Sequence, residues 1–61
     1  MTANQERWAE ALAIEQMHGP GACAWVAGRI GDLVMKGDVA GIARFKAIAE
    51  KLDALRVGSR Q

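Results

Sequence analysis

Residues 19–41 have the sequence GPGACAWVAGRIGDLVMKGDVAG and contain both of the turns that decide the fold. In the first turn, Gly19-Pro20-Gly21, glycine accepts the left-handed backbone that follows a helix end, and proline disfavours helical geometry in the residue before it. In the second turn Gly37 is the matching helix stop. Asp38 is then a good N-cap, because its carboxylate is favoured at the positive end of the following helix. These turns divide the chain into three segments, each of which we expect to be helical.

The capping and turn residues set the expected bounds of the helices, which are residues 3–18, 22–36 and 39–56. Thr2 and Gln5 have the spacing of a capping box, in which each side chain accepts a hydrogen bond from the backbone N–H of the other residue. Residues 58–61 are expected to form a short flexible tail. Because both connections are short, neighbouring helices should be antiparallel or meet at a helix-turn-helix corner. The sequence thus predicts an all-α fold, a compact three-helix unit that forms a single domain.

Each predicted helix has apolar residues at helical spacing. The apolar face of the second helix comprises Cys23, Val26, Ala27, Ile30, Leu33 and Val34. The apolar face of the third helix comprises Gly41, Phe45, Ile48, Ala49, Leu52 and Leu55. In the first helix the strongest stripe is formed by Trp8, Ala11 and Leu12, whereas Ile14 and Met17 lie well away from it. This broad apolar arc is too wide for one neighbouring helix to cover.

The small size of the chain limits how much core it can form. At 61 residues it lies near the lower limit of what one hydrophobic core can hold folded. Cys23 is the only cysteine, so no intramolecular disulfide can add stability, and a lone thiol fits a reducing compartment. The polar residues 1–7 do not resemble a signal peptide, and the apolar stretch 22–35 is too short and too charged to span a bilayer. We therefore expect a cytoplasmic protein, stabilised by efficient helix packing or within a homo-oligomeric helical assembly.

Few residues could carry chemistry. Cys23 and His18 are the only conceivable nucleophile and base, and no third residue is placed to orient them. We expect Cys23 to lie in the core and His18 to stand at the end of a helix. Glu6 and Glu10 share a helix face and are expected to be solvated. The sequence therefore predicts no enzyme, no metal site and no cofactor.

Small residues form a stripe along the flank of the second helix, comprising Ala24, Gly28, Gly31 and Met35. Each glycine lowers helix stability by about 1 kcal/mol relative to alanine, so a compensating close contact is expected. That contact could come from another helix of the same chain or from a second chain. Trp25 lies nearby, either as an interface anchor or as a cover over the edge of the domain. The candidate interface is Trp25, Gly28, Gly31 and Met35, for a homodimer or another protein.

DNA binding of the helix-turn-helix type is the alternative function. The Gly37-Asp38 turn joins two helices, and the last of them carries Arg44, Lys51 and Arg56 as candidate contacts to nucleic acid. Two observations count against this alternative. The net charge is only +1, and Lys46 points away from the side that carries Arg44 and Lys51.

Several short strings occur together in the sequence: Trp8-Ala9-Glu10-Ala11-Leu12, His18-Gly19, Ile30-Gly31, Gly37-Asp38-x-x-Gly41 and Ile48-Ala49-x-x-Leu52-Asp53. In this combination the chain resembles a family of short uncharacterised alphaproteobacterial proteins. The resemblance covers about residues 7–55. It implies a bacterial, cytoplasmic, helical protein, and it implies no activity, cofactor or catalytic residue because the family has none assigned.

Overall fold

The computed structural model describes residues 2–58, and all of the regular secondary structure in that range is helical. The elements are α1 (Ala3–His18), the short 3₁₀ helix η1 (Gly19–Gly21), α2 (Ala22–Lys36) and α3 (Val39–Gly58). The predicted bounds of the first two α-helices are confirmed. The prediction that the third ends at residue 56 is wrong, because glycine lowers helix propensity without forbidding the helical conformation and α3 continues through Gly58. The rest of the predicted tail, residues 59–61, lies outside the described residues.

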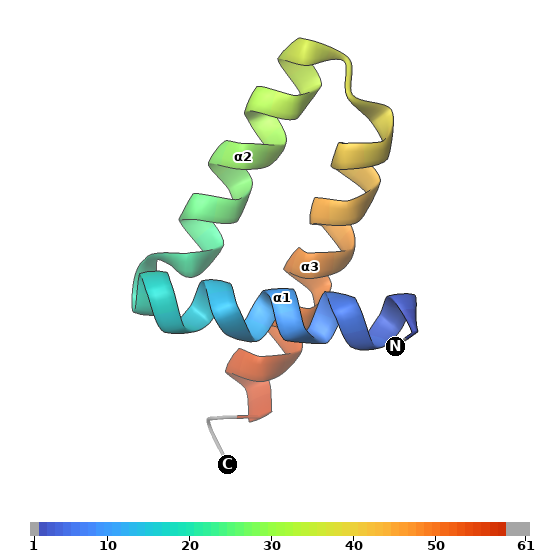
Figure 1. Cartoon of the computed structure of the whole chain (residues 1–61). Coiled ribbons are helices and arrows are strands. Elements are labelled where there is room, and N and C mark those ends of the chain that lie inside the picture. The colour runs from blue at the N-terminus through green and yellow to red at the C-terminus, as the bar shows by residue number, and fades with distance from the viewer. Residues whose placement is uncertain (1, 59–61) are drawn as a thin grey trace.

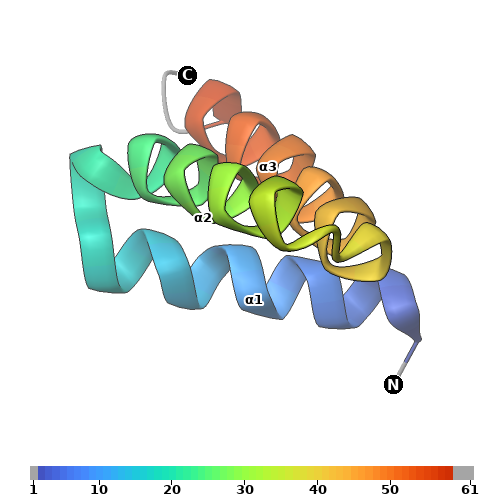
Figure 2. The ribbon, with the colours of Figure 1, turned by 90° about the horizontal axis from the view of Figure 1, so that it is seen from above.

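The helices α2 and α3 form an antiparallel hairpin, and α1 crosses one face of it (Figure 1). Viewed from above, α1 lies in a layer of its own (Figure 2), and the front view shows it against the half of the hairpin that is farther from the α2–α3 turn (Figure 1). The molecule measures 38 × 27 × 17 Å, with a radius of gyration of 11.6 Å. A compact domain of this length would have a radius of gyration of about 10.5 Å. The end of the hairpin that carries the α2–α3 turn therefore extends beyond α1, which covers the other end (Figure 1). No helix in the described range is long and apolar enough to cross a membrane.

The beginning and end of α1 are fixed as the sequence predicts. The Thr2 N–H donates to Gln5 Oε1 at 2.9 Å, and the Gln5 N–H donates to Thr2 Oγ1 at 3.1 Å, which completes the capping box. Gly19 ends the helix with φ of 53°, and its N–H donates to the Glu15 carbonyl. Because a side chain is strained at positive φ, glycine is the residue that lets the chain turn here.

The α2–α3 turn is held by backbone hydrogen bonds and by one side chain. Gly37 has φ of 71°, its N–H donates to the Val34 carbonyl at 3.1 Å, and the Asp38 N–H donates to the Leu33 carbonyl at 3.0 Å. These bonds form a Schellman motif, which satisfies the last carbonyls of α2. Asp38 Oδ1 then accepts from the Gly41 N–H at 2.9 Å, so the predicted N-cap of α3 is confirmed.

Gly41 is the glycine at which another group approaches most closely. A Cβ atom added there would lie 2.8 Å from Asp38 Oδ2 and 3.0 Å from Leu33 Cδ2. Both distances are shorter than ordinary van der Waals contact. The spacing Gly37-Asp38-x-x-Gly41 is therefore a structural unit, in which the first glycine turns the chain and the second leaves room for the cap.

The core is small. Its buried residues are Ala11, Ile14, Ala22, Val26, Leu33, Ile48 and Leu52. Partly buried Ile30, Phe45, Ala49 and Leu55 pack around it. The predicted face of α3 is thus confirmed, because its members lie in the core or at its margin. Few of the buried side chains are large, so the core is thin for a chain of this length.

The predicted faces of the other two helices need correction. In α1 the buried residues are Ala11 and Ile14, whereas Leu12 is 43% exposed. The reason is that α1 crosses the hairpin at a steep angle (Figure 1), and the part of its surface that the crossing buries is the side with Ala11 and Ile14. In α2, Ala27 and Val34 are exposed although they were expected in the core. Both residues lie at the edge of the helix face that carries buried Val26 and Leu33, and this edge is left exposed.

Candidate functional site

Within residues 2–58, no other element covers one side of α2. Its residues are Ala24, Gly28, Gly31 and Met35, which we call the outer face of α2, and all of them are exposed. A methyl group added at Gly28 or Gly31 would meet no neighbouring element within 4 Å. The sequence allowed a close contact with these glycines either from another helix of the same chain or from a second chain. Among the described residues, no other helix of the chain makes this contact. The outer face of α2 is open to a second molecule.

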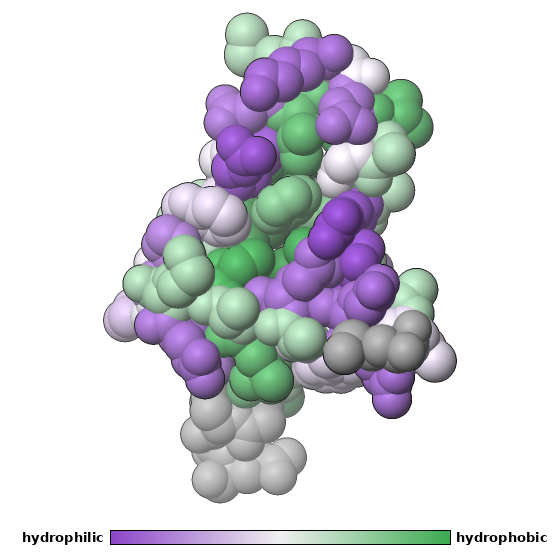
Figure 3. Space-filling model, in the orientation of Figure 1, coloured by the Kyte–Doolittle hydropathy of each residue, from purple (hydrophilic) through white to green (hydrophobic). Residues whose placement is uncertain are grey.

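Large apolar side chains are exposed where α2 meets α3. Met35 is 89% exposed, Val39 is 77% exposed and Val34 is 58% exposed. In the space-filling view, apolar and polar groups lie side by side at this end of the hairpin (Figure 3). Met35 thus extends the outer face of α2 with an accessible thioether side chain, a kind of side chain that adapts readily to partner surfaces.

Trp25 lies beside this face and is 36% exposed. Its ring stacks on His18, the last residue of α1, with a centroid distance of 4.6 Å and an interplanar angle of 19°. The Phe45 ring lies 6.2 Å away on α3. Trp25 therefore covers the edge where the three helices meet and still presents part of its indole to solvent.

Charged side chains line the flank of α2 that also carries Trp25. They are Arg29, Asp32 and Lys36. Within residues 2–58 none of these side chains is in an ion pair, and the Arg29 guanidinium carbon lies 5.9 Å from the centroid of the Phe45 ring. The apolar outer face of α2 thus has charges of both signs along one edge.

The candidate nucleic-acid contacts on α3 each interact with another part of the chain. Arg44 donates from Nε to Glu10 Oε2 at 3.0 Å and also donates from Nη2 to the same oxygen. Lys51 Nζ lies 5.0 Å from the centroid of the Trp8 ring, and Arg56 Nη1 donates to Cys23 Sγ at 3.3 Å. Because Glu10 and Trp8 belong to α1, the side of α3 that carries Arg44 and Lys51 faces α1.

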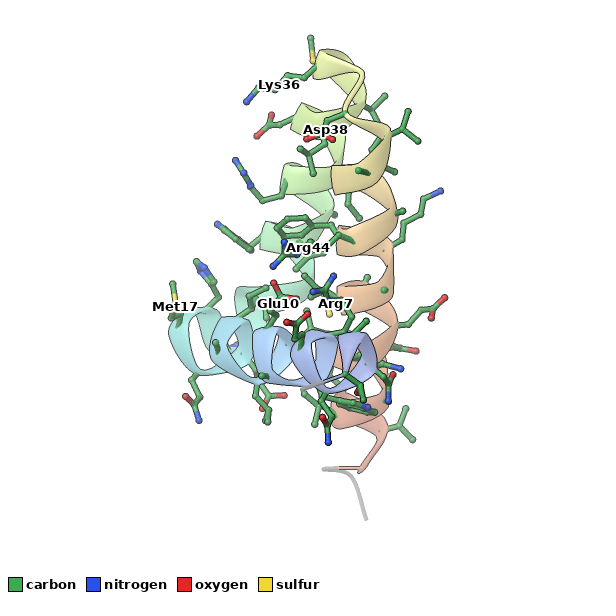
Figure 4. All side chains as sticks on the ribbon, turned by 45° about the vertical axis from the view of Figure 1, so that its right-hand side comes forward. Arg7, Glu10, Met17, Lys36, Asp38 and Arg44 are labelled. Carbon is green, nitrogen blue, oxygen red and sulfur yellow. The ribbon has the colours of Figure 1, made fainter. Side chains whose placement is uncertain are left out.

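A charge cluster joins α1 to α3, and the sequence analysis missed it. Arg7, Glu10 and Arg44 lie together where the two helices cross (Figure 4). Arg7 Nε lies 2.6 Å from Glu10 Oε1, so the carboxylate has a guanidinium on each oxygen. The hydrogen bond from Arg44 to Glu10, supported by the negative charges of Glu10 and Glu6, raises the pKa of Arg44 above its ordinary value. Glu10 is therefore a structural bridge and not part of a solvated acidic face, whereas Glu6 is exposed as expected.

Cys23 is half-buried and not fully in the core as expected. It borders a hollow of about 70 Å³ that Glu15, Pro20, Leu52 and Arg56 also line. His18 ends α1 as predicted, and its stacking on Trp25 gives the ring a structural contact. Among the described residues there is no group of three or more histidine, cysteine, aspartate or glutamate side chains that could hold a metal ion.

Comparison with known proteins places the chain in a family. No curated protein and no solved structure has significant similarity to it. A family model described as a family of unknown function, DUF6961, matches residues 3–60, which is nearly the whole chain. This match includes all three helices and both turns, and the chain therefore belongs to the DUF6961 family of unknown function.

Proposed function

We propose that the chain is a non-enzymatic protein–protein interaction module that binds through the outer face of α2. The observation that carries this proposal is the absence of any covering element over Gly28 and Gly31 among the described residues. A helix surface that faced only water would gain stability from alanine or from charged residues at these positions. Glycine instead allows another backbone to approach closely.

The two open glycines of α2 lower the stability of the helix. Two glycines inside a helix lower its stability by about 2 kcal/mol relative to alanine. A domain of this length has a total free energy of unfolding of about 3–9 kcal/mol. The two open glycines thus cost a sizeable share of the stability, and no contact within the described chain offsets that cost. A partner that packs on the outer face of α2 would offset it.

We also propose that the protein is bacterial and acts in the cytoplasm. The lone cysteine supports this location, because single thiols are typical of reducing compartments. DNA binding through α3 stays an alternative prediction. The contacts of Arg44 and Lys51 with α1 favour the interaction module over it, because a recognition helix must present its basic side to the groove.

Site-specific photo-crosslinking in the producing cells tests the proposal. A photoreactive amino acid at position 35 lies on the outer face of α2, and the same amino acid at exposed Gln16 of α1 is the matched control. We expect a covalent adduct with a protein from position 35 and none from position 16. If position 35 gives no protein adduct, the proposed function is wrong.

A further inference from the structure

We propose that the outer face of α2 is covered by a second copy of this chain, with the two α2 helices antiparallel across a two-fold axis between Gly28 and Gly31. This inference rests on the proposed function and names the partner. It is based on three properties of the exposed residues of α2: their spacing, their charges and the position of the exposed large apolar side chains.

The spacing of the outer face is symmetric along the helix. The midpoint between Gly28 and Gly31 is also the midpoint between Ala24 and Met35. In an antiparallel pair about this midpoint, Gly28 lies opposite the partner's Gly31, so the two backbones approach where neither has a side chain. Met35, which is 89% exposed, then lies opposite the small side chain of the partner's Ala24. The face is thus complementary in shape to itself.

The charges along the flank are complementary in the same arrangement. With a rise of about 1.5 Å per residue, Arg29 lies about 3 Å along the axis from the partner's Asp32. Both side chains are on the same flank of α2, and a two-fold axis normal to the plane of the helices brings these flanks together. Neither side chain has an ion-pair partner within residues 2–58. The symmetry therefore brings opposite charges near each other, and two ion pairs form when Arg29 turns from the Phe45 ring toward the partner; these pairs would fix the register.

The apolar residues beside the outer face also find partners. On the charged flank, Trp25 lies about 1.5 Å along the axis from the partner's Met35, which suits a sulfur–aromatic contact. On the other flank, Val34 lies about 3 Å along the axis from the partner's Ala27. Val34 is 58% exposed in the single chain. The proposed pair therefore covers Ala27 and Val34, which were expected to be buried and are exposed in the single chain.

Absolute molar mass from light scattering, measured on the full chain over concentrations on the order of 1–100 µM, tests the inference. We expect a mass of twice 6.5 kDa for the wild type. Gly31→Leu should raise the dimer Kd by at least about 30-fold, because the added side chain keeps the backbones apart. The site is open in the single chain, so circular dichroism should show unchanged helicity. Ala43→Leu, at an exposed position of α3, is the matched control and should leave the dimer intact.

Charge reversal tests the register. Asp32→Arg should weaken the dimer, and Asp32→Arg combined with Arg29→Asp should restore it. A wild type of 6.5 kDa throughout the range would overturn the inference, as would a dimer that Gly31→Leu leaves unchanged. A dimer that Asp32→Arg does not weaken would overturn the antiparallel register. A monomer whose position 35 crosslinks to a different protein would overturn self-association and leave the proposed function standing.

Discussion

Gly41→Ala should destabilise the protein, although glycine-to-alanine changes inside helices usually stabilise. The new methyl group would lie 2.8 Å from Asp38 Oδ2 and 3.0 Å from Leu33 Cδ2. Loss of the Asp38 cap costs about 1 kcal/mol, and overpacking against Leu33 adds at least about 1 kcal/mol. The gain in helix propensity offsets about 1 kcal/mol of this. The net loss of about 1 kcal/mol corresponds to a fall in Tm of about 4–8 °C.

A double-mutant cycle with Asp38→Ala isolates the cause of this loss. Thermal unfolding of the wild type, both single variants and the double variant would be followed by circular dichroism at one protein concentration. In the Asp38→Ala background the cap is already gone, so adding Gly41→Ala should cost little or should stabilise. If Gly41→Ala raises the Tm in the wild-type background, the steric argument is refuted. Equal effects in both backgrounds would show that Asp38 is not the group that the methyl disturbs.

The remaining predictions concern the core, the charge cluster and the alternative function. Leu52→Ala should lower the free energy of unfolding by about 2–5 kcal/mol and unfold much of the population, which circular dichroism would show as lost helicity. Leu12→Ala should cost much less, because Leu12 is 43% exposed. Equal losses in the two variants would contradict the observed core. Glu10→Gln should lower the Tm, and the difference from the wild type should shrink at high salt, since Arg44 would lose its carboxylate partner. Fluorescence anisotropy with duplex DNA at low salt should show no binding, and salt-dependent binding that Lys51→Ala weakens would favour the alternative instead.

The parts of the fold that depend on local sequence were predictable. The capping box at Thr2, the left-handed glycines and the Asp38 cap each involve residues a few positions apart, so spacing and residue type are enough to locate them. The helix bounds follow from these signals. The end of α3 was predicted two residues too early, because a glycine near a helix end can either stop the helix or remain inside it, and Gly58 remains inside.

The buried face of α1 was not predictable from its own pattern. The predicted stripe of Trp8, Ala11 and Leu12 was right for Ala11, which is fully buried, but it included exposed Leu12 and left out buried Ile14. A small residue at a steep crossing is buried because of where the other helices lie, and periodicity within one helix does not contain that information. The same holds for Glu10, whose partner Arg44 lies 34 positions away in sequence.

The candidate site was located in part from the sequence. Helical projection brought Gly28 and Gly31 onto one stripe with Met35, and the structure shows that this stripe is exposed. The sequence could not decide whether another helix of the chain covered it, because that depends on the path of α1. It also gave no sign that Arg29 and Asp32 have no ion-pair partner within residues 2–58, which is a property of the folded chain.

We propose that a protein covers the outer face of α2 and that this protein is a second copy of the chain. Light scattering on purified wild type and Gly31→Leu, compared at the same concentration, tests it most directly. We expect a mass of twice 6.5 kDa for the wild type and a mass near 6.5 kDa for a folded Gly31→Leu variant. A wild type that stays at 6.5 kDa, or a dimer that the substitution does not disturb, would contradict it.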